Sequence, residues 1–136
     1  MPGIVYDNIS VLVVEDQDFV RDLVATVLRQ IGFRQVSTAS DGTAALKAVG
    51  LEPPKLILCD INMEPMNGIE FIQHLQKAGF TGIKRIPTIF LTAHTEEALV
   101  KKAVAIGIDA FLIKPVKRQI LEQKIEAVLS RAGITR

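Results

Sequence analysis

The sequence predicts a single α/β domain in which a five-stranded parallel sheet is covered by helices on both faces. Two observations lead to this fold class. Short apolar runs alternate along the chain with amphipathic segments, which is the pattern of repeated strand–helix units. Several of the runs are rich in Val, Ile and Leu and barely alternate, as strands buried on both faces do. Right-handed crossovers then favour a doubly wound sheet, for which the strand order 2-1-3-4-5 is the common solution.

The strands are expected where the apolar runs fall. The five runs cover residues 9–14, 35–39, 55–59, 87–91 and 110–113. Each run is followed by a segment with apolar residues at helical spacing and polar residues elsewhere on the turn. The chain is therefore interpreted as five successive strand–helix units, a (βα)₅ arrangement.

Each segment after a strand predicts one helix whose apolar stripe packs on the sheet. The stripes consist of Phe19, Leu23, Val27 and Ile31; Ala44, Leu46 and Val49; Phe71, Ile72 and Leu75; Ala98, Leu99, Ala103 and Ile106; and Ile120, Leu121, Ile125, Val128 and Leu129. Asp41 and Gly42 mark the turn into the second helix, and Thr95 is the expected cap of the fourth, with Glu96 and Glu97 in its first turn. Left-handed caps are expected near the helix ends, at Gly32, Gly50, Gly79 and Gly107.

Length and composition narrow the class of protein. The 136 residues suggest one domain, with its core at about residues 9–129 and no output domain after it. A formal net charge of +1 gives no field for nucleic acid or a membrane surface. One cysteine fits a reducing compartment, and neither a membrane span nor a secretion signal is evident. We therefore expect a cytoplasmic protein that binds no nucleic acid and inserts into no membrane.

Distinctive polar residues follow four of the five apolar runs, whereas the second is followed by an unremarkable Ser40. Glu15 and Asp16 follow the first, Asp60 the third, Thr92 the fourth, and Lys114-Pro115 the fifth. Ligands of open α/β sheets bind at the carboxyl ends of the strands, and the strands 1, 3, 4 and 5 are neighbours in the predicted order. The sequence thus predicts that three carboxylates, a hydroxyl and an ammonium group gather on one rim.

Each of these residues also has an ordinary structural explanation. Glu15 and Asp16 could cap the first helix, and Asp60 could simply end a strand. Three clustered carboxylates are nevertheless a poor structural device, because two of them about 4 Å apart repel by roughly 4 kcal/mol at an effective dielectric near 20. Carboxylate oxygens suit Mg²⁺, and a cation, a lysine and a hydroxyl around a carboxylate form an arrangement for phosphoryl transfer.

The residues at the strand ends match a known family. Five motifs carry the match: Val13-Val14-Glu15-Asp16, Asp60-Ile61-Asn62-Met63, Met66-Asn67-Gly68, Leu91-Thr92-Ala93 and Lys114-Pro115. With them the chain resembles, from about residue 9 to residue 129, the receiver domain of bacterial two-component response regulators. This resemblance implies a flavodoxin-like fold and a phospho-accepting signalling switch rather than an enzyme that acts on other substrates.

The resemblance implies a role for each site residue. Asp60 would be the phosphorylated carboxylate, and Mg²⁺, or alternatively Mn²⁺, would be held with it by Asp16, by Glu15 and by the backbone carbonyl of Asn62. Lys114 and Thr92 would contact the phosphoryl group, and the bond from Lys114 to Pro115 would be cis. The side chains of Asn62 and His94 would tune hydrolysis.

Three positions depart from the commonest family pattern. Glu64 precedes Pro65 where proline usually comes first, Asn67 replaces a frequent aspartate, and Phe111 stands at the aromatic switch position where tyrosine is also common. The family's switch would couple Thr92 and Phe111 to the surface formed by the fourth helix, the fifth strand and the fifth helix. The departures affect the loop and the switch rather than the phosphorylation site.

The implied partners are a histidine kinase or a histidine phosphotransfer protein as phosphodonor, and a downstream protein target. The chain is expected to be a monomer or a weak dimer. Two rival functions stay open at this point. One is a receiver-like module that binds partners without phosphorylation. The other is an aspartyl-phosphate phosphatase, although Asn62 stands where such an enzyme of the haloacid-dehalogenase kind carries its acid. A flavin carrier is disfavoured because Glu15-Asp16-Gln17 would repel phosphate.

Overall fold

The computed structural model describes residues 5–93 and 97–134, with the side chain of residue 83 excepted. Its five strands form one parallel sheet of order β2-β1-β3-β4-β5, which confirms the predicted fold class and topology. The strands are β1 (Ser10–Val14), β2 (Gln35–Ala39), β3 (Leu56–Asp60), β4 (Thr88–Thr92) and β5 (Ala110–Ile113). His94, Thr95 and Glu96, for which the sequence predicted roles, lie outside the described residues.

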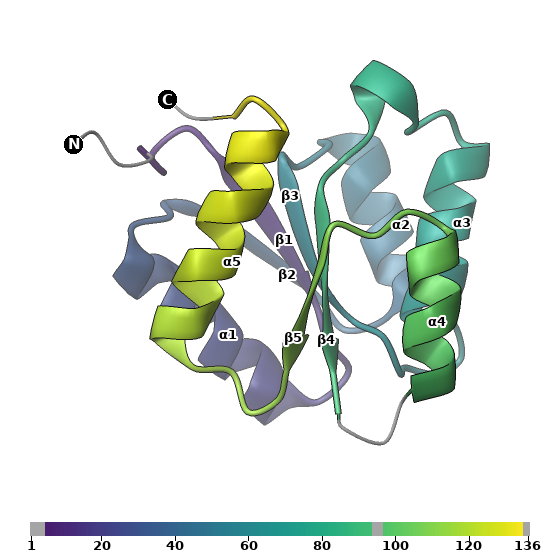
Figure 1. Cartoon of the computed structure of the whole chain (residues 1–136), viewed down its shortest axis with the longest axis horizontal. Helices are drawn as coiled ribbons and strands as arrows, with labels where there is room; N and C mark the ends of the chain where they lie inside the picture. Colours follow the sequence, from purple (N-terminus) through teal and green to yellow (C-terminus); the bar gives the residue numbers. More distant parts are fainter. Residues whose placement is uncertain (1–4, 94–96, 135–136) are drawn as a thin grey trace.

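The helices cover both faces of the sheet, as Figure 1 shows. They are α1 (Asp18–Ile31), α2 (Gly42–Leu51), α3 (Gly68–Lys77), α4 (Glu97–Ala105) and α5 (Arg118–Arg131), with a short 3-10 helix η1 (Gly82–Lys84) before β4. Helices α1 and α5 lie on one face, and α2, α3 and α4 lie on the other. Within the described residues, no helix is both long and apolar enough to cross a bilayer.

The three central strands separate two apolar cores. In β1, Val11 and Val13 belong to the core under α1 and α5, and Leu12 and Val14 to the core under the other helices. Strands β3 and β4 alternate in the same way and are buried at every residue. This double burial explains their nearly continuous apolar sequences.

The edge strands differ from the expectation of strands buried on both faces. Strand β2 exposes Gln35, Ser37 and Thr38 and buries only Ala39. In β5 only Leu112 is fully buried. Each edge strand has a neighbour on one side only, so polar residues there keep their contact with water.

The predicted apolar stripe of α1 is wrong at its start. Phe19 is 80% exposed and Leu23 is 38% exposed, whereas Val24 and Leu28 are fully buried. Residues four apart are rotated by about 40° around a helix of 3.6 residues per turn, so a strict four-residue spacing drifts off one face. Ala98 in α4 and Ile120 in α5, the first residues of their predicted stripes, are also exposed.

The ends of strands β3 and β4 and of helix α2 differ from the prediction. Strands β3 and β4 include Asp60 and Thr92, and Asp60 is aligned with Leu91 in the ladder. Gly32, Gly79 and Gly107 have positive φ after their helices, as predicted. Gly50 lies inside α2 without a positive φ, so its predicted cap role is wrong. The extension of the strands matters most, because it places two site residues on the rigid sheet itself.

Candidate functional site

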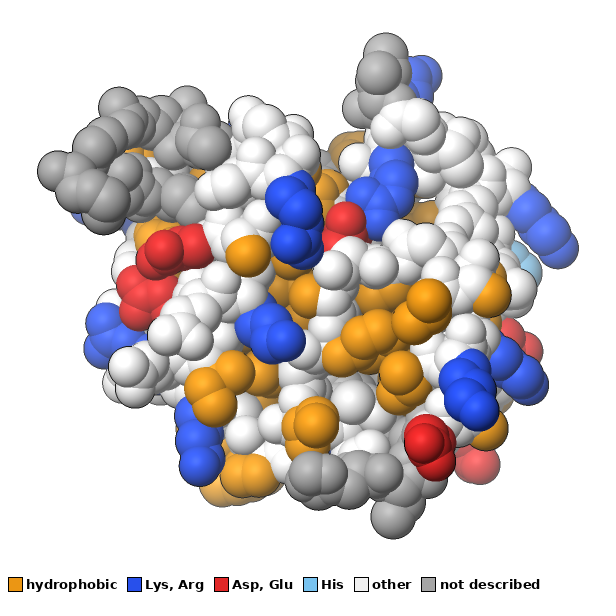
Figure 2. All heavy atoms as spheres, in the orientation of Figure 1, with side chains coloured by type: hydrophobic (Ala, Val, Ile, Leu, Met, Phe, Trp, Pro, Cys, Tyr) orange, Lys and Arg blue, Asp and Glu red, His pale blue; other side chains and the backbone are white. Residues whose placement is uncertain are grey.

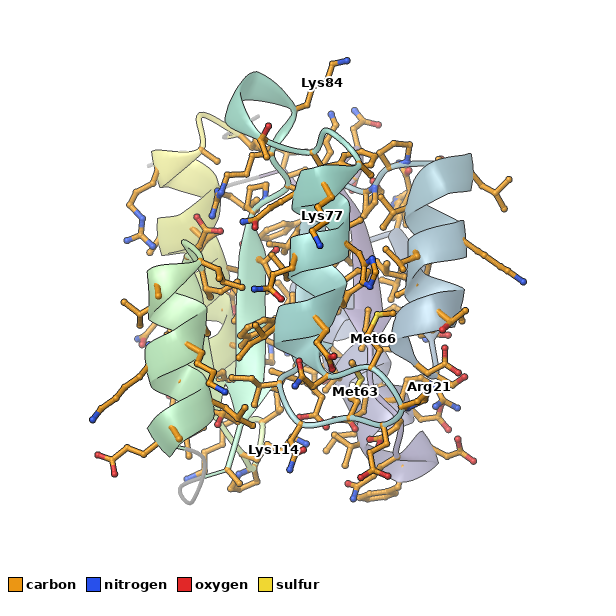
Figure 3. The ribbon with its side chains drawn as sticks, turned by 90° about the vertical axis from the view of Figure 1, so that its right-hand side faces the viewer. Arg21, Met63, Met66, Lys77, Lys84 and Lys114 are labelled. Atoms are coloured by element: carbon orange, nitrogen blue, oxygen red, sulfur yellow. The ribbon has the colours of Figure 1, made fainter. Side chains whose placement is uncertain are left out.

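The carboxyl ends of β1, β3, β4 and β5 meet at one edge of the sheet. Figure 3 shows Lys114 and Arg21 at this edge on either side of Met63, with Lys77 and Lys84 nearer the opposite end of the molecule. Within the described ranges, the predicted site residues other than Phe111 follow or end these four strands. The topology therefore brings together residues that are nearly a hundred positions apart in the sequence.

Three carboxylates form the centre of the site. One oxygen each of Glu15, Asp16 and Asp60 lies within 4.8 Å of the others. Glu15 is fully buried and Asp60 is 5% exposed, whereas Asp16 is exposed to solvent. The acidic residues thus form a cluster with two buried members and one that opens to water.

Lys114 supplies the opposing charge. Its Nζ lies 3.0 Å from Glu15 Oε1 and 3.3 Å from Asp60 Oδ2. Burial by itself lowers the pKa of Lys114, but the contact with Glu15 and the charges of Asp60 and Glu15 raise it above its usual value. The ammonium group therefore stays charged and bridges two carboxylates that would otherwise repel each other.

Both carboxylate oxygens of Asp60 make contacts with neighbouring groups. The backbone N–H of Asn62 donates to Oδ1 at 3.2 Å, and Lys114 contacts Oδ2. Burial raises the pKa of Asp60 above its usual value, and Lys114 and the Asn62 N–H oppose this shift. The pKa of Asp16 is also raised, first by desolvation and then by the hydrogen bond and charge of Glu15. Desolvation is therefore the main cause of both shifts, and only at Asp16 does the neighbouring Glu15 add to it.

The donor set fits a hard divalent cation. Glu15 Oε1 is buried and has no hydrogen bond of good geometry among the described residues, so its contact with Lys114 is an ion pair only. The other two carboxylates contribute oxygen donors at the same point, and the exposed Asp16 leaves that point open to water. Oxygen donors with access to water are what Mg²⁺ requires, and Mn²⁺ accepts the same ligands.

Comparison with known proteins identifies the family. The model of the response regulator receiver domain matches residues 11–126 of the chain. The chain belongs to this family. It is 37% identical to a probable chemotaxis protein CheY of Rhizobium etli over 122 residues, which are 90% of this chain and 93% of that protein. It is 36% identical to the phosphate regulon transcriptional regulatory protein PhoB of Escherichia coli, covering 89% of this chain and 52% of that protein.

Solved structures agree with the assignment. The receiver resembles the chemotaxis protein CheY4 of Vibrio cholerae with a TM-score of 0.80 and 30% sequence identity, over 89% of this chain and 98% of that chain. The similarity therefore extends over the whole sheet and its helices. The resemblance inferred from the strand-end motifs is confirmed.

The remaining predicted residues of the receiver lie at or near the site. Thr92 is buried at the end of β4, and its hydroxyl donates to the carbonyl of Ala93 at 3.1 Å. The bond between Lys114 and Pro115 is cis, as predicted. The side chain of Asn62 is exposed next to Asp60, and the predicted use of its carbonyl as a metal ligand stays a prediction.

Phe111 lies deeper than the rim. It is half-buried on β5, and its ring is 6.3 Å from that of the fully buried Phe90, at an angle of 57°. Phe90 and Thr92 are two residues apart on β4 and so point to the same face of the sheet. Phe111 is aligned with Phe90, which places the predicted switch residue on the face that Thr92 shares.

Two features of the receiver's site were missed by sequence reasoning. A Cβ at Gly68 would lie only 2.7 Å from the carbonyl oxygen of Asp60. The start of α3 can therefore approach the end of β3 because this residue has no side chain. Arg21 donates to the backbone oxygen of Glu15 at 3.0 Å. Gly68 stands in a motif that could have drawn attention to it, but no sequence pattern marks a backbone acceptor for Arg21.

The loop between β3 and α3 accommodates the other family departures. The bond from Glu64 to Pro65 is cis. Asn67 caps α3 in place of the frequent aspartate: its Oδ1 accepts from the N–H of Glu70 at 2.8 Å, and the Oε1 of Glu70 accepts from the N–H of Asn67 at 3.0 Å. Asparagine therefore performs the capping role at this position.

Proposed function

We propose that this receiver domain is a phosphorylation switch in which Asp60 accepts a phosphoryl group from a phosphohistidine donor. The observation that carries the proposal is the position of Asp60, which ends a buried central strand beside two further carboxylates and one ammonium group. A structural role alone would not favour three carboxylates within 4.8 Å of one another.

The metal would be held by Glu15, Asp16 and Asp60, with the carbonyl of Asn62 as the expected further ligand. Bound there, Mg²⁺ would supply charge neutralisation to the phosphoryl oxygens. The described residues themselves orient the reacting carboxylate, because the N–H of Asn62 and the ammonium of Lys114 hold its two oxygens. A carboxylate fixed in this way loses little freedom when it attacks.

In the transfer step, one oxygen of Asp60 forms a bond to phosphorus as the bond from phosphorus to the donor imidazole nitrogen breaks. That nitrogen keeps the electron pair, and the product on this chain is an acyl phosphate. Lys114 is close enough to follow the new charge, because its Nζ already lies 3.3 Å from Asp60 Oδ2. Hydrolysis of the acyl phosphate would return the carboxylate, so the protein would act on itself rather than turn over other substrates.

The output would pass through Thr92 and Phe111 to the surface of α4, β5 and α5. Figure 2 shows apolar side chains gathered over this region, and the exposed ones include Val104, Ile113 and Ile120. A hollow of about 420 Å³ lies beside Phe111 and is lined by Lys124 and Arg131 of α5. A shift of Phe111 would change this hollow, which supports a downstream protein as the target.

The partners follow from this proposal. The phosphodonor would be a histidine kinase or a histidine phosphotransfer protein, and the receiver would work in the cytoplasm as a monomer or weak dimer without binding nucleic acid.

The proposal is tested by incubating the protein with a small phosphodonor and Mg²⁺ and measuring its intact mass. We expect the mass of one phosphoryl group on the wild type, and none on Asp60→Asn or in the presence of a chelator. A wild type that gains no phosphate would leave a phosphorylation-independent interaction module as the function. Steady hydrolysis of phosphate monoesters would instead favour a phosphatase.

A further inference from the structure

Arg21 lies beside the acidic cluster and has contacts that the proposed mechanism does not use. It is placed in the first turns of α1, and its side chain is only 17% exposed. Its Nη1 donates to the backbone oxygen of Glu15 at 3.0 Å, and its Nη2 donates to Asp18 Oδ1 at 2.6 Å. Arg21 is drawn at the same edge of the molecule as Lys114 (Figure 3).

These two contacts hold the loop between β1 and α1 from both of its ends. Glu15 follows the last residue of β1, and Asp18 is the first residue of α1, so Asp16 lies between the two groups that Arg21 binds. Other contacts hold Glu15 itself: its N–H donates to the carbonyl of Ala39 at 3.1 Å, and its carboxylate pairs with Lys114 at 3.0 Å. Gln17 makes no side-chain cap for α1, and its N–H donates to Glu15 Oε2 at 3.2 Å.

Helix stability does not explain an arginine at this position. The N-terminal end of a helix carries a partial positive charge, so a cation in the first turns is unfavourable by a few tenths to about 1 kcal/mol. The ion pair with Asp18 offsets little of this, because Asp18 is 85% exposed and surface pairs contribute about 0–1 kcal/mol. The second nitrogen of the guanidinium group makes an additional contact, with the carbonyl of Glu15, and this contact accounts for the arginine.

We propose that Arg21 is a positioning residue that fixes the loop at residues 15–17, so that the carboxylates of Glu15 and Asp16 face the metal position. This role rests on the proposed function, because a metal is needed there only for phosphorylation. The property that Arg21 is proposed to affect is the affinity of the site for the metal. Residues that orient metal ligands typically change affinity or activity by about 10- to 100-fold when they are replaced. Lysine cannot take the role over, because it lacks the planar fork that reaches two acceptors at once.

The sign of the effect separates positioning from simple electrostatics. Replacing Arg21 by methionine removes a positive charge near a cation site, which by Coulomb's law alone would strengthen the binding of a divalent cation. Loss of positioning would weaken it. The matched control is Arg29→Met, which also removes one positive charge, from an exposed position in the last turn of the same helix, at the end away from the loop.

The experiment is a calorimetric titration of the full-length protein with Mn²⁺ alone, with thermal unfolding of each variant as the folding control. We expect Arg21→Met to bind Mn²⁺ about 10- to 100-fold more weakly, Arg21→Lys to fall between it and the wild type, and Arg29→Met not to lose affinity. An Arg21→Met protein that is folded and binds Mn²⁺ as tightly as the wild type, or more tightly, would overturn the inference. Full restoration by lysine would overturn it too, and Arg21→Lys also decides the matter if Arg21→Met does not fold.

Phosphorylation gives an independent readout. If Arg21 positions the metal ligands, the Mg²⁺ concentration for half-maximal phosphorylation rises in Arg21→Met, and saturating Mg²⁺ restores the rate. A wild type that takes no phosphate would refute the proposed function, and the Mn²⁺ titration would still decide the role of Arg21. A phosphorylated wild type with unchanged Mn²⁺ binding in Arg21→Met would refute the role of Arg21 alone.

Discussion

Gly68 and Gly50 should respond to the same substitution with opposite signs. A Cβ at Gly68 would lie 2.7 Å from the carbonyl oxygen of Asp60 and 3.1 Å from the Cα of Ile61. At Gly50, in the last turn of α2, a Cβ would meet nothing within 4 Å. Neither residue has a positive φ, so alanine strains the backbone conformation of neither.

The size of each effect follows from two opposing terms. Alanine is favoured over glycine in a helix by up to about 1 kcal/mol, and by less near a helix end. Overpacking a tight contact costs about 1–3 kcal/mol. Two of the atoms that crowd Gly68 belong to the backbone of Asp60 and Ile61, which cannot rotate away as a side chain can. We therefore expect Gly68→Ala to lower the free energy of unfolding by about 1–2 kcal/mol and Gly50→Ala to raise it by about 0.5 kcal/mol.

The measurement is urea unfolding of both variants and the wild type, followed by far-UV circular dichroism in metal-free buffer. The midpoint should fall for Gly68→Ala and rise slightly for Gly50→Ala, with unchanged m-values. A thermal scan should show a Tm lower by roughly 4 °C per kcal/mol for Gly68→Ala. If Gly68→Ala were as stable as the wild type, the close approach of α3 to Asp60 would not be the reason for a glycine there.

Three further predictions concern the charged site and a buried phenol. The folded protein raises the pKa of Asp60, so the stabilising contribution of this carboxyl is complete below the unfolded pKa near 3.8 and is lost as the pH rises through the folded pKa. Asp60→Asn should therefore be more stable than the metal-free wild type at pH 7. In urea titrations this difference should shrink toward pH 4, and a constant difference would contradict the prediction. Mg²⁺ at about 100 times its Kd should stabilise the wild type by about 2.7 kcal/mol, but Asp16→Asn much less, as thermal shifts would show; equal shifts would remove Asp16 from the metal site. Burial raises the pKa of Tyr6 to about 12 from 10.0, so the contribution of Tyr6 to the free energy of unfolding should be full below pH 10 and fall by about 1–2 kcal/mol as the pH rises to 12. Tyr6→Phe should lose this pH dependence without losing stability at pH 7, because the hydroxyl has no hydrogen-bond partner among the described residues. A destabilised Tyr6→Phe would count against this reasoning.

The strand-end residues could be predicted because their signal is local. A polar residue directly after a buried run, as at Asp60 and Lys114, is unusual in any strand, and the topology of parallel sheets brings such residues together. The pairing of Lys114 with Glu15 as well as with Asp60 required the structure, since the sequence implied only a contact with the phosphoryl group. The number of carboxylates was thus readable, but their mutual distances were not.

The predictions that failed depended on contacts between distant residues, which local sequence does not show. The stripe through Phe19 and Leu23 failed because a four-residue spacing drifts around the helix, and no local signal shows where the drift leaves the core. Gly50 and Gly68 both lie near a helix end, yet only Gly68 lies against the backbone of another element. Arg21 was missed because its acceptor is a carbonyl, which every residue has.

The central claim is that Asp60 carries the phosphoryl group. The most direct measurement is peptide mapping by mass spectrometry of the protein phosphorylated by a small donor with Mg²⁺, under conditions that preserve acyl phosphates. We predict one phosphoryl group per chain, located on the peptide that contains Asp60, and none on Asp60→Asn. A phosphoryl group on Asp16 or Glu15, or equal labelling of Asp60→Asn, would contradict the account.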